Sequence, residues 1–463
     1  MKNSILKTGL LAATFLIGGN VQAQNPPQAI ADSLQYILDN SLPSTYAQSG
    51  AVMSVHVPGK WTWNGSAGNG ISGNTVGQVI TTATPTTKFR VGSITKTMVA
   101  TCIMLLEEQG LIGLQDPIIN HLRPTMVNDT IQSSDTVRVL HLLNHTSGIA
   151  NAADNMTCQQ DVLANPLNSH SLEEAVYCGA SQGEVFPPGF VWGYSNTNYT
   201  LLAMIIENLT GMSYEAYLTQ EIITPLGLTN TEVPTTNQIN GDHMGCYWNI
   251  GQWIDLTIIN PTTYTGWADV VSNTEDLLTF YKALRDGNIV TQASLTKMMT
   301  IDPASYDYGL GLDFYQVGGD WYFGHYGEVA NSSAMMYADV QTIVAPNGYY
   351  ISYNFNVQGV DMGNVIDVPV YDLLHNDALS MNELEVVKEY SIYPNPSKDV
   401  FFLSGDLSQQ VICKVYDLSG KLVQTEVLGQ GQSKLNCDNL AKGVYTLAIV
   451  SENKIETHKL ILE

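Results

Sequence analysis

The chain changes character near residue 383, and this change limits its fold more than any other feature. Before residue 383, short strands and Pro/Gly turns alternate with segments whose apolar residues have helical spacing, which predicts helices over 29–40, 95–109, 201–209, 214–222 and 367–379. After it, apolar and polar residues alternate in short segments at 400–403, 411–416, 444–450 and 458–462. Such alternation is typical of strands with one buried face. We therefore predict an α+β domain over residues 24–380, a linker over 381–387 and a small all-β sandwich over 388–463.

The first 23 residues have the features of a signal peptide. Lys2 and Lys7 precede a mostly apolar run from Gly9 to Gly19, and Val21-Gln22-Ala23 offers a cleavage site before Gln24. The apolar run is too short to cross a bilayer, and no later run is long enough. We expect export through the periplasm, a secreted or cell-surface location, and no integral membrane segment in the mature chain.

Charge and composition exclude several classes of function. The chain has 19 Lys and Arg against 43 Asp and Glu, a net charge of −24, so it lacks the basic surface that nucleic acids require. Apolar residues make up 44% of the chain, which is enough for a full core. The cysteine spacings match no zinc site, and His141 and His145 lack the Glu of a zincin motif. We expect no metal and no cofactor.

The cysteines suggest one structural crosslink. Cys158 and Cys178 flank a polar stretch of an exported chain, which favours a disulfide between them. Cys102 lies in the apolar segment 95–109 and is predicted to be a core thiol.

The first candidate for chemistry is the pair Ser93 and Lys96. Residues three apart share one face of a helix, and a lysine buried beside a serine loses its charge more easily and becomes a base. Serine at the start of a helix also places backbone N–H groups near a developing oxyanion. The spacing alone is weak, because an N-cap serine explains it equally well and Ser-x-x-Lys recurs at Ser4, Ser294 and Ser451.

Two further motifs supply groups of the right kind. Tyr194 can move protons beside a lysine, and Asn196 offers an amide that can orient Lys96 and donate to a substrate carbonyl. In His325-Tyr326-Gly327, the glycine permits close approach of a substrate, and the backbone N–H of Glu328 is a candidate oxyanion donor. Both patterns recur elsewhere, at Tyr247-x-Asn249, Tyr393-x-Asn395 and His243-x-Gly245.

The order of these motifs resembles the serine β-lactamase/penicillin-binding-protein superfamily. It is most similar to the class C β-lactamase-related branch, which includes D-alanyl-D-alanine carboxypeptidases and esterases. The sequence around these motifs also resembles that of the family over roughly residues 28–380. The matching segments are FRVGSITK, LLNHTSGI, PPGFVWGYSNTNYTLLAMIIENLTG and PLGLTNT. The resemblance implies a five-stranded antiparallel sheet with flanking helices beside a helical subdomain. It also implies an acyl-enzyme at Ser93, with Lys96 as base, Tyr194 as proton shuttle and Asn196 as orienting amide.

The chain departs from the family pattern at one motif. His325 stands where β-lactamases usually carry lysine, and the histidine form is more typical of peptidases and esterases. Tyr326 replaces a threonine that commonly helps to bind the substrate carboxylate, which argues against both β-lactamase and carboxypeptidase activity. The sequence therefore predicts a secreted serine hydrolase, a peptidase or esterase, acting on a small-molecule or peptide acyl donor. A true β-lactamase and a non-catalytic surface protein on the same fold remain alternatives.

The C-terminal segment resembles the type IX secretion (Por) sorting domain of the Bacteroidetes. The matching residues are Tyr393-Pro394-Asn395-Pro396, Asp417-Leu418-Ser419-Gly420-Lys421, Gly443-Val444-Tyr445 and Lys459-Leu460-Ile461. The resemblance implies the type IX secretion machinery as a partner.

Overall fold

The chain separates into two compact units, Met1–Asp377 and Ala378–Glu463. The computed structural model describes residues 24–43, 49–71, 80–122, 131, 133–342, 344–375, 390–405, 410–417, 422–429, 431, 433–451 and 454–463. The predicted signal peptide (1–23) and linker (381–387) lie outside the described residues.

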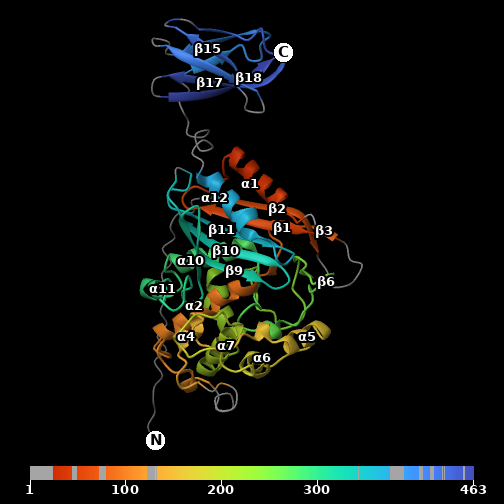
Figure 1. The fold of residues 1–463 in the computed structure, drawn as a ribbon, viewed down its shortest axis with the longest axis vertical. Coiled ribbons are helices and arrows are strands. Elements are labelled where there is room, and N and C mark those ends of the chain that lie inside the picture. Colours follow the sequence, from red (N-terminus) through yellow and green to blue (C-terminus); the bar gives the residue numbers. More distant parts are fainter. Residues whose placement is uncertain are drawn as a thin grey trace. The chain divides into compact units, whose positions relative to one another are not determined.

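The first unit is built on one antiparallel sheet of seven strands, in the order β3-β2-β1-β11-β10-β9-β8 (Figure 1). The strands are β1 (Gly50–Val57), β2 (Trp61–Ile71), β3 (Ile80–Thr82), β8 (Asp313–Val317), β9 (Asp320–Glu328), β10 (Ser332–Asp339) and β11 (Tyr349–Phe355). The expected number was five. The sheet is larger because the short β3 extends the β2 edge and β8 turns directly back onto β9.

Helices cover both faces of this sheet. The helix α1 (Gln28–Asn40) buries Ile30, Leu34 and Leu38, which recur every four residues, and packs with α12 (Val368–His375) on one side (Figure 1). On the other face, α10 (Thr274–Arg285) contacts β1, β10 and β11.

The remaining helices of the first unit form the helical subdomain. Its helices are α2 (Thr95–Glu108), α4 (Val139–Leu143), α5 (Met156–Ala164), α6 (Leu172–Ala180), α7 (Asn196–Thr210), α8 (Tyr214–Leu218), α9 (Thr224–Leu226) and α11 (Gln292–Met298). Short strands β4 (Phe89–Arg90) and β7 (Val271–Ser272) pair with each other, as do β5 (Tyr247–Asn249) and β6 (Trp253–Asp255). The 3₁₀ turns are η1 (Gly92–Ile94), η2 (Ile118–Asn120), η3 (Ala152–Asp154) and η5 (Pro261–Tyr264), and the π-helical turns are η4 (Thr219–Ile223) and η6 (Gly363–Asp367).

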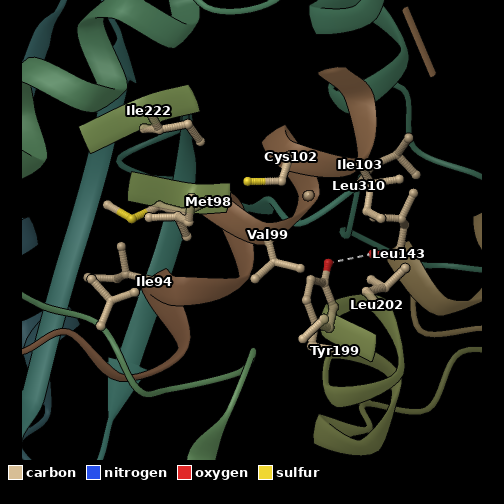
Figure 2. Packing of buried hydrophobic residues seen from close by; sticks show 14 of the residues in the cluster. Ile94, Met98, Val99, Cys102, Ile103, Leu143, Tyr199, Leu202, Ile222 and Leu310 are labelled. Carbon is tan, nitrogen blue, oxygen red and sulfur yellow. Dashed lines mark hydrogen bonds between the residues drawn. The ribbon is translucent and has the colours of Figure 1, made fainter. Parts of the chain in front are cut away.

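The helix α2 lies in the centre of the first unit. Eleven of its fourteen residues are buried, so it has apolar contacts on nearly every side. Figure 2 shows Met98, Val99 and Cys102 packed among side chains of neighbouring elements, with the Tyr199 hydroxyl donating to the Leu143 carbonyl at 2.8 Å. Cys102 is confirmed as a core thiol. This packing fixes the start of α2, where Lys96 lies, and the turn η1 before it, which contains Ser93.

The second unit consists of two antiparallel sheets that share one core. One contains β12 (Tyr390–Tyr393), β13 (Val400–Gly405) and β16 (Lys434–Asn436). The other contains β15 (Leu422–Leu428), β14 (Val411–Tyr416), β17 (Gly443–Ser451) and β18 (Lys454–Leu462). Phe401, Leu435, Val415 and Leu447 come from both sheets and are fully buried, as expected for the predicted sandwich.

The predicted disulfide is present. Cys158 of α5 and Cys178 of α6 are bonded, with their Cα atoms 6.0 Å apart. It joins α5 to α6, and α5 itself buries none of its side chains fully.

Candidate active site

Two glycines bring Ser93 against the strand β9. Gly92 has φ of +58°, and a Cβ there would meet the backbone N of Glu328 at 2.5 Å. A Cβ on Gly327 would lie 2.0 Å from the Val91 carbonyl oxygen and 3.0 Å from the backbone N of Ser93. Only glycine fits at either position. The backbone nitrogen atoms of Ser93 and Glu328 therefore both lie at this contact, and their N–H groups are the candidate oxyanion donors.

Lys96 lies behind Ser93 in the first turn of α2. Its Nζ is 2.8 Å from the Ser93 Oγ and 3.1 Å from the Trp267 carbonyl oxygen, and the residue is fully buried. Burial lowers the pKa of Lys96 well below its usual value, while the carboxylates of Asp313 and Asp269 raise it only in part. A neutral amine in contact with a hydroxyl can accept its proton.

Tyr194 approaches the same oxygen from another direction. Its hydroxyl donates to Ser93 Oγ at 2.9 Å, and its ring centroid is 4.9 Å from Lys96 Nζ. Burial raises the pKa of Tyr194 well above its usual value. Tyr194 is therefore a phenol that donates a hydrogen bond, and the phenolate form of the expected shuttle is disfavoured.

Asn196 lines the cavity beside Tyr194 but does not hydrogen-bond Lys96. The Trp267 carbonyl takes that place on the lysine. The backbone N–H of Asn196 donates to Asn151 Oδ1, and among the described residues its own Oδ1 is buried without a hydrogen-bond partner. The expected orientation of Lys96 by Asn196 is therefore replaced by a backbone contact from a distant loop.

His325 is held between two side chains that the motifs did not reveal. Tyr308 Oη is 3.0 Å from His325 Nε2, and Asp313 Oδ2 is 3.4 Å from Nδ1. Burial lowers the pKa of His325, the Asp313 carboxylate raises it, and Lys96 lowers it further. The net lowering favours the neutral ring near pH 7.

Tyr326 does not place its hydroxyl among the catalytic groups. Side chains alternate along β9, and the Tyr326 hydroxyl donates to Asp367 Oδ2 at 2.6 Å. Tyr315 and Tyr353 donate to the same buried carboxylate. The Tyr326 hydroxyl is thus bound to Asp367 and is not free to take over the role of a carboxylate-binding threonine, although Tyr326 lines the cavity.

A cavity of about 550 Å³ unites these groups. Its lining includes the predicted residues Ser93, Tyr194, Asn196, His325, Gly327 and Glu328. Lys96 is absent from the lining because it is buried behind Ser93. Apolar side chains form much of the rest, among them Val162, Leu163, Trp248, Leu256 and Trp267. A second cavity of about 640 Å³ lies along α5 and α6. It shares Trp267 and Tyr264 with the first cavity, but Ser93, Tyr194 and His325 do not line it.

The competing pairs Ser294/Lys297 and His141/His145 do not line the active-site cavity. Ser294 is buried at the start of α11, and Lys297 Nζ forms an ion pair with Glu107 at 2.7 Å. His141 accepts from the Arg138 N–H at the start of α4, whereas His145 is buried beside the Tyr194 ring. Among the residues that the structure describes, no three His, Cys, Asp or Glu side chains are placed to bind a metal together.

Sequence reasoning missed Trp267, Tyr308 and Asp313. Each is far along the chain from Ser93, in a turn or at a strand end, and none belongs to a recognisable spacing pattern. Only their place in the folded structure reveals them.

Comparisons with known proteins agree with this arrangement. The Beta-lactamase family model matches residues 31–367, and the model of the secretion system C-terminal sorting domain matches residues 391–463. The Bacillus subtilis protein named "Putative penicillin-binding protein PbpX" is 28% identical over 296 residues, covering 63% of this chain and 68% of that protein.

Two solved structures are similar over nearly their whole length. The D-stereospecific amidohydrolase from Streptomyces sp. has a TM-score of 0.63 at 29% identity, covering 73% of this chain and 97% of that one. The D-amino acid amidase from Ochrobactrum anthropi has a TM-score of 0.62 at 25% identity, covering 76% and 98%.

The sorting domain indicates type IX secretion to the cell surface or beyond. No helix among the described residues is long and apolar enough to cross a membrane. The match to the Beta-lactamase family model spans most of the chain and includes Ser93, Lys96 and Tyr194. The chain therefore belongs to the Beta-lactamase family of serine hydrolases.

Proposed function

We propose that the chain is an exported serine hydrolase that forms an acyl-enzyme at Ser93 and acts as a peptidase, amidase or esterase. One observation carries the proposal: Ser93 Oγ lies 2.8 Å from a buried lysine amine and 2.9 Å from a tyrosine hydroxyl, at the wall of a cavity. A plain N-cap serine does not need either partner.

In acylation, neutral Lys96 accepts the proton of Ser93 Oγ as that oxygen attacks the substrate carbonyl. The oxyanion is bound by the backbone N–H groups of Ser93 and Glu328. The carbonyl re-forms as the bond to the leaving group breaks, and the leaving group receives the proton from Lys96 by way of the Tyr194 hydroxyl. Water then attacks the acyl-enzyme and gives its proton to Lys96. As the bond between the acyl carbon and Ser93 Oγ breaks, Lys96 returns this proton to Ser93 Oγ, and the acid leaves. Each positioned proton donor or acceptor contributes on the order of 10²–10⁴-fold to such a reaction.

Three features favour amide or ester substrates over β-lactams. His325 stands in place of the usual lysine, the described lining contains no lysine or arginine to bind a β-lactam carboxylate, and two similar structures are named as acting on D-stereoisomers or D-amino acid amides. D-Amino acid amides and aryl esters are the first substrates to assay.

The test is covalent labelling of the full-length chain by a fluorophosphonate, followed by intact mass and peptide mapping. We expect one adduct on Ser93, hydrolysis of aryl esters by the wild type, and loss of both in Ser93→Ala. Ser294→Ala is the matched control, because it removes the serine of the other Ser-x-x-Lys pair of the domain and should retain labelling. Full activity in Ser93→Ala would refute the proposal, and absence of both labelling and turnover would favour a non-catalytic protein. Rapid opening of a penicillin would instead favour a β-lactamase.

We further propose that residues 1–23 direct the chain to the periplasm and that residues 391–463 then direct it across the outer membrane. A chain lacking residues 391–463 should remain in the periplasmic fraction of a type IX-competent host. Its appearance in the medium at wild-type level would contradict this route.

A further inference from the structure

The described lining of the active-site cavity has negative charge only. Glu328 and Asp313 are its carboxylates, and no lysine or arginine is among the described residues that line it. A substrate carboxylate in this cavity would be repelled and would find no cationic side chain to compensate it. A substrate cation would be attracted.

Glu328 is the carboxylate nearest to the reacting atoms along the chain. It follows Gly327, and its own backbone N–H is a candidate oxyanion donor. Its side chain is exposed at the cavity, and its contacts are three long ones: Ser332 Oγ, Gln358 Nε2 and the Gly359 N–H, each at 3.4 Å. All three are neutral, and no ion pair joins Glu328 to a described cation. This charge is available to a ligand.

Asp313 adds a second carboxylate to the lining of the cavity. It lies at the start of β8 and contacts His325 at 3.4 Å. Burial lowers the pKa of His325, so the ring is neutral near pH 7 and does not cancel the Asp313 charge. Lys96, the next cation, is buried behind Ser93 rather than in the lining.

The remaining wall provides room for an apolar group. Trp248, Leu256, Val162 and Leu163 line the same cavity of about 550 Å³. An acyl donor with an apolar side chain, a cationic group and an uncharged leaving group fits these properties together. Amides and esters of apolar amino acids with a free amino group have all three.

Building on the proposed acyl-enzyme function, we propose that Glu328 binds the free ammonium group of an amino acid amide or ester and is the residue that determines specificity. Donors that are N-acylated or carry a carboxylate in place of the amine are poor substrates.

The test compares the p-nitroanilides of D- and L-phenylalanine with their N-acetyl derivatives, using the full-length chain. We expect kcat/KM for the better free-amine enantiomer to exceed that for its N-acetyl derivative by up to about fivefold, the range of an exposed ion pair. Above about pH 8 this preference should decline, because the substrate ammonium loses its proton.

Glu328→Gln keeps the shape and removes the charge. The free-amine substrate should lose most of its advantage over the N-acetyl substrate through a higher KM, and Glu328→Asp should restore part of the preference. Asp372→Asn, an exposed change on α12, is the matched control and should leave the ratio unchanged.

Two outcomes would overturn the specificity proposal alone. One is that fluorophosphonate labels Ser93 while N-acetyl and free-amine substrates react equally. The other is that Glu328→Gln lowers both substrates in parallel, which would indicate damage to the oxyanion donor. Failure of Ser93 labelling together with absence of turnover would instead overturn the proposed acyl-enzyme function.

Discussion

Lys96 combines complete burial with a direct contact to the candidate nucleophile. Its lowered pKa has a clear cause, because the apolar surroundings penalise the charged amine more than the distant carboxylates of Asp313 and Asp269 stabilise it. Such a shift at a cavity wall is typical of catalytic groups, whereas a structural lysine normally keeps its charge in water.

Lys96→Arg tests this role. Arginine remains protonated at every accessible pH, so it cannot accept the Ser93 proton, and kcat/KM should fall by about 10²–10⁴-fold. In the wild type, activity should rise with pH through the lowered pKa of Lys96, because only the neutral amine is a base. The measurement is the pH profile of kcat/KM on an uncharged aryl ester, and Lys297→Arg is the control. An active Lys96→Arg enzyme would exclude lysine as the base.

At the scale of elements, the site depends on close contact between the start of α2 and the strand β9. Gly327→Ala would place a methyl group 2.0 Å from the Val91 carbonyl oxygen. The strand must move away from Ser93, so activity should fall by at least about 10²-fold, the usual loss for a removed oxyanion donor. Overpacking should also cost about 1–3 kcal/mol of stability.

The control is Gly363→Ala, where the added Cβ meets nothing closer than 3.8 Å. Thermal unfolding and kcat/KM are measured for both variants. Wild-type kcat in Gly327→Ala would contradict the close-contact geometry.

The disulfide stabilises an element that packing alone holds weakly. The helix α5 has no fully buried side chain, yet its residues Gln159, Val162 and Leu163 form part of the cavity wall. Cys158 and Cys178 are separated by 20 residues, and a loop of this size predicts a stabilisation of about 3 kcal/mol.

The Cys158→Ser/Cys178→Ser variant should therefore unfold at lower temperature and show a raised KM. Reductant should lower the Tm of the wild type toward that of the variant and leave the variant unchanged. Equal Tm values for the oxidised wild type and the variant would show that α5 does not need the crosslink.

At the scale of the whole molecule, the two units have separate cores. The core around α2 and the core between the two C-terminal sheets share no buried residue. All described residues of the active-site cavity come from the first unit. The residues described around Ser93 thus belong to one unit.

Removal of residues 391–463 should leave kcat/KM within about twofold of the full-length value. Each unit has its own core, so a change in one has little effect on the other. The measurement is hydrolysis of the same ester by both forms, with fluorophosphonate titration of active sites. A large loss of kcat in the shorter form would mean that the C-terminal unit supports the active site.

Local patterns were sufficient to predict much of this protein. Helical spacing predicted α1, α2 and α7, alternation predicted strands of the C-terminal unit, and the Ser93/Lys96 spacing placed both groups on one helical face. These features depend on neighbours within a few residues, so a linear pattern contains them.

Tertiary structure decided what distant segments bring together. The Trp267 carbonyl, rather than the Asn196 amide, holds Lys96, and the Tyr326 hydroxyl donates to the distant Asp367. The burial that lowers the pKa of Lys96, and the acidic lining formed by Glu328 and Asp313, likewise arise only when the sheet and the helical subdomain enclose the cavity. Sequence spacing fixes which groups share an element, but desolvation and long-range contact depend on how the elements pack.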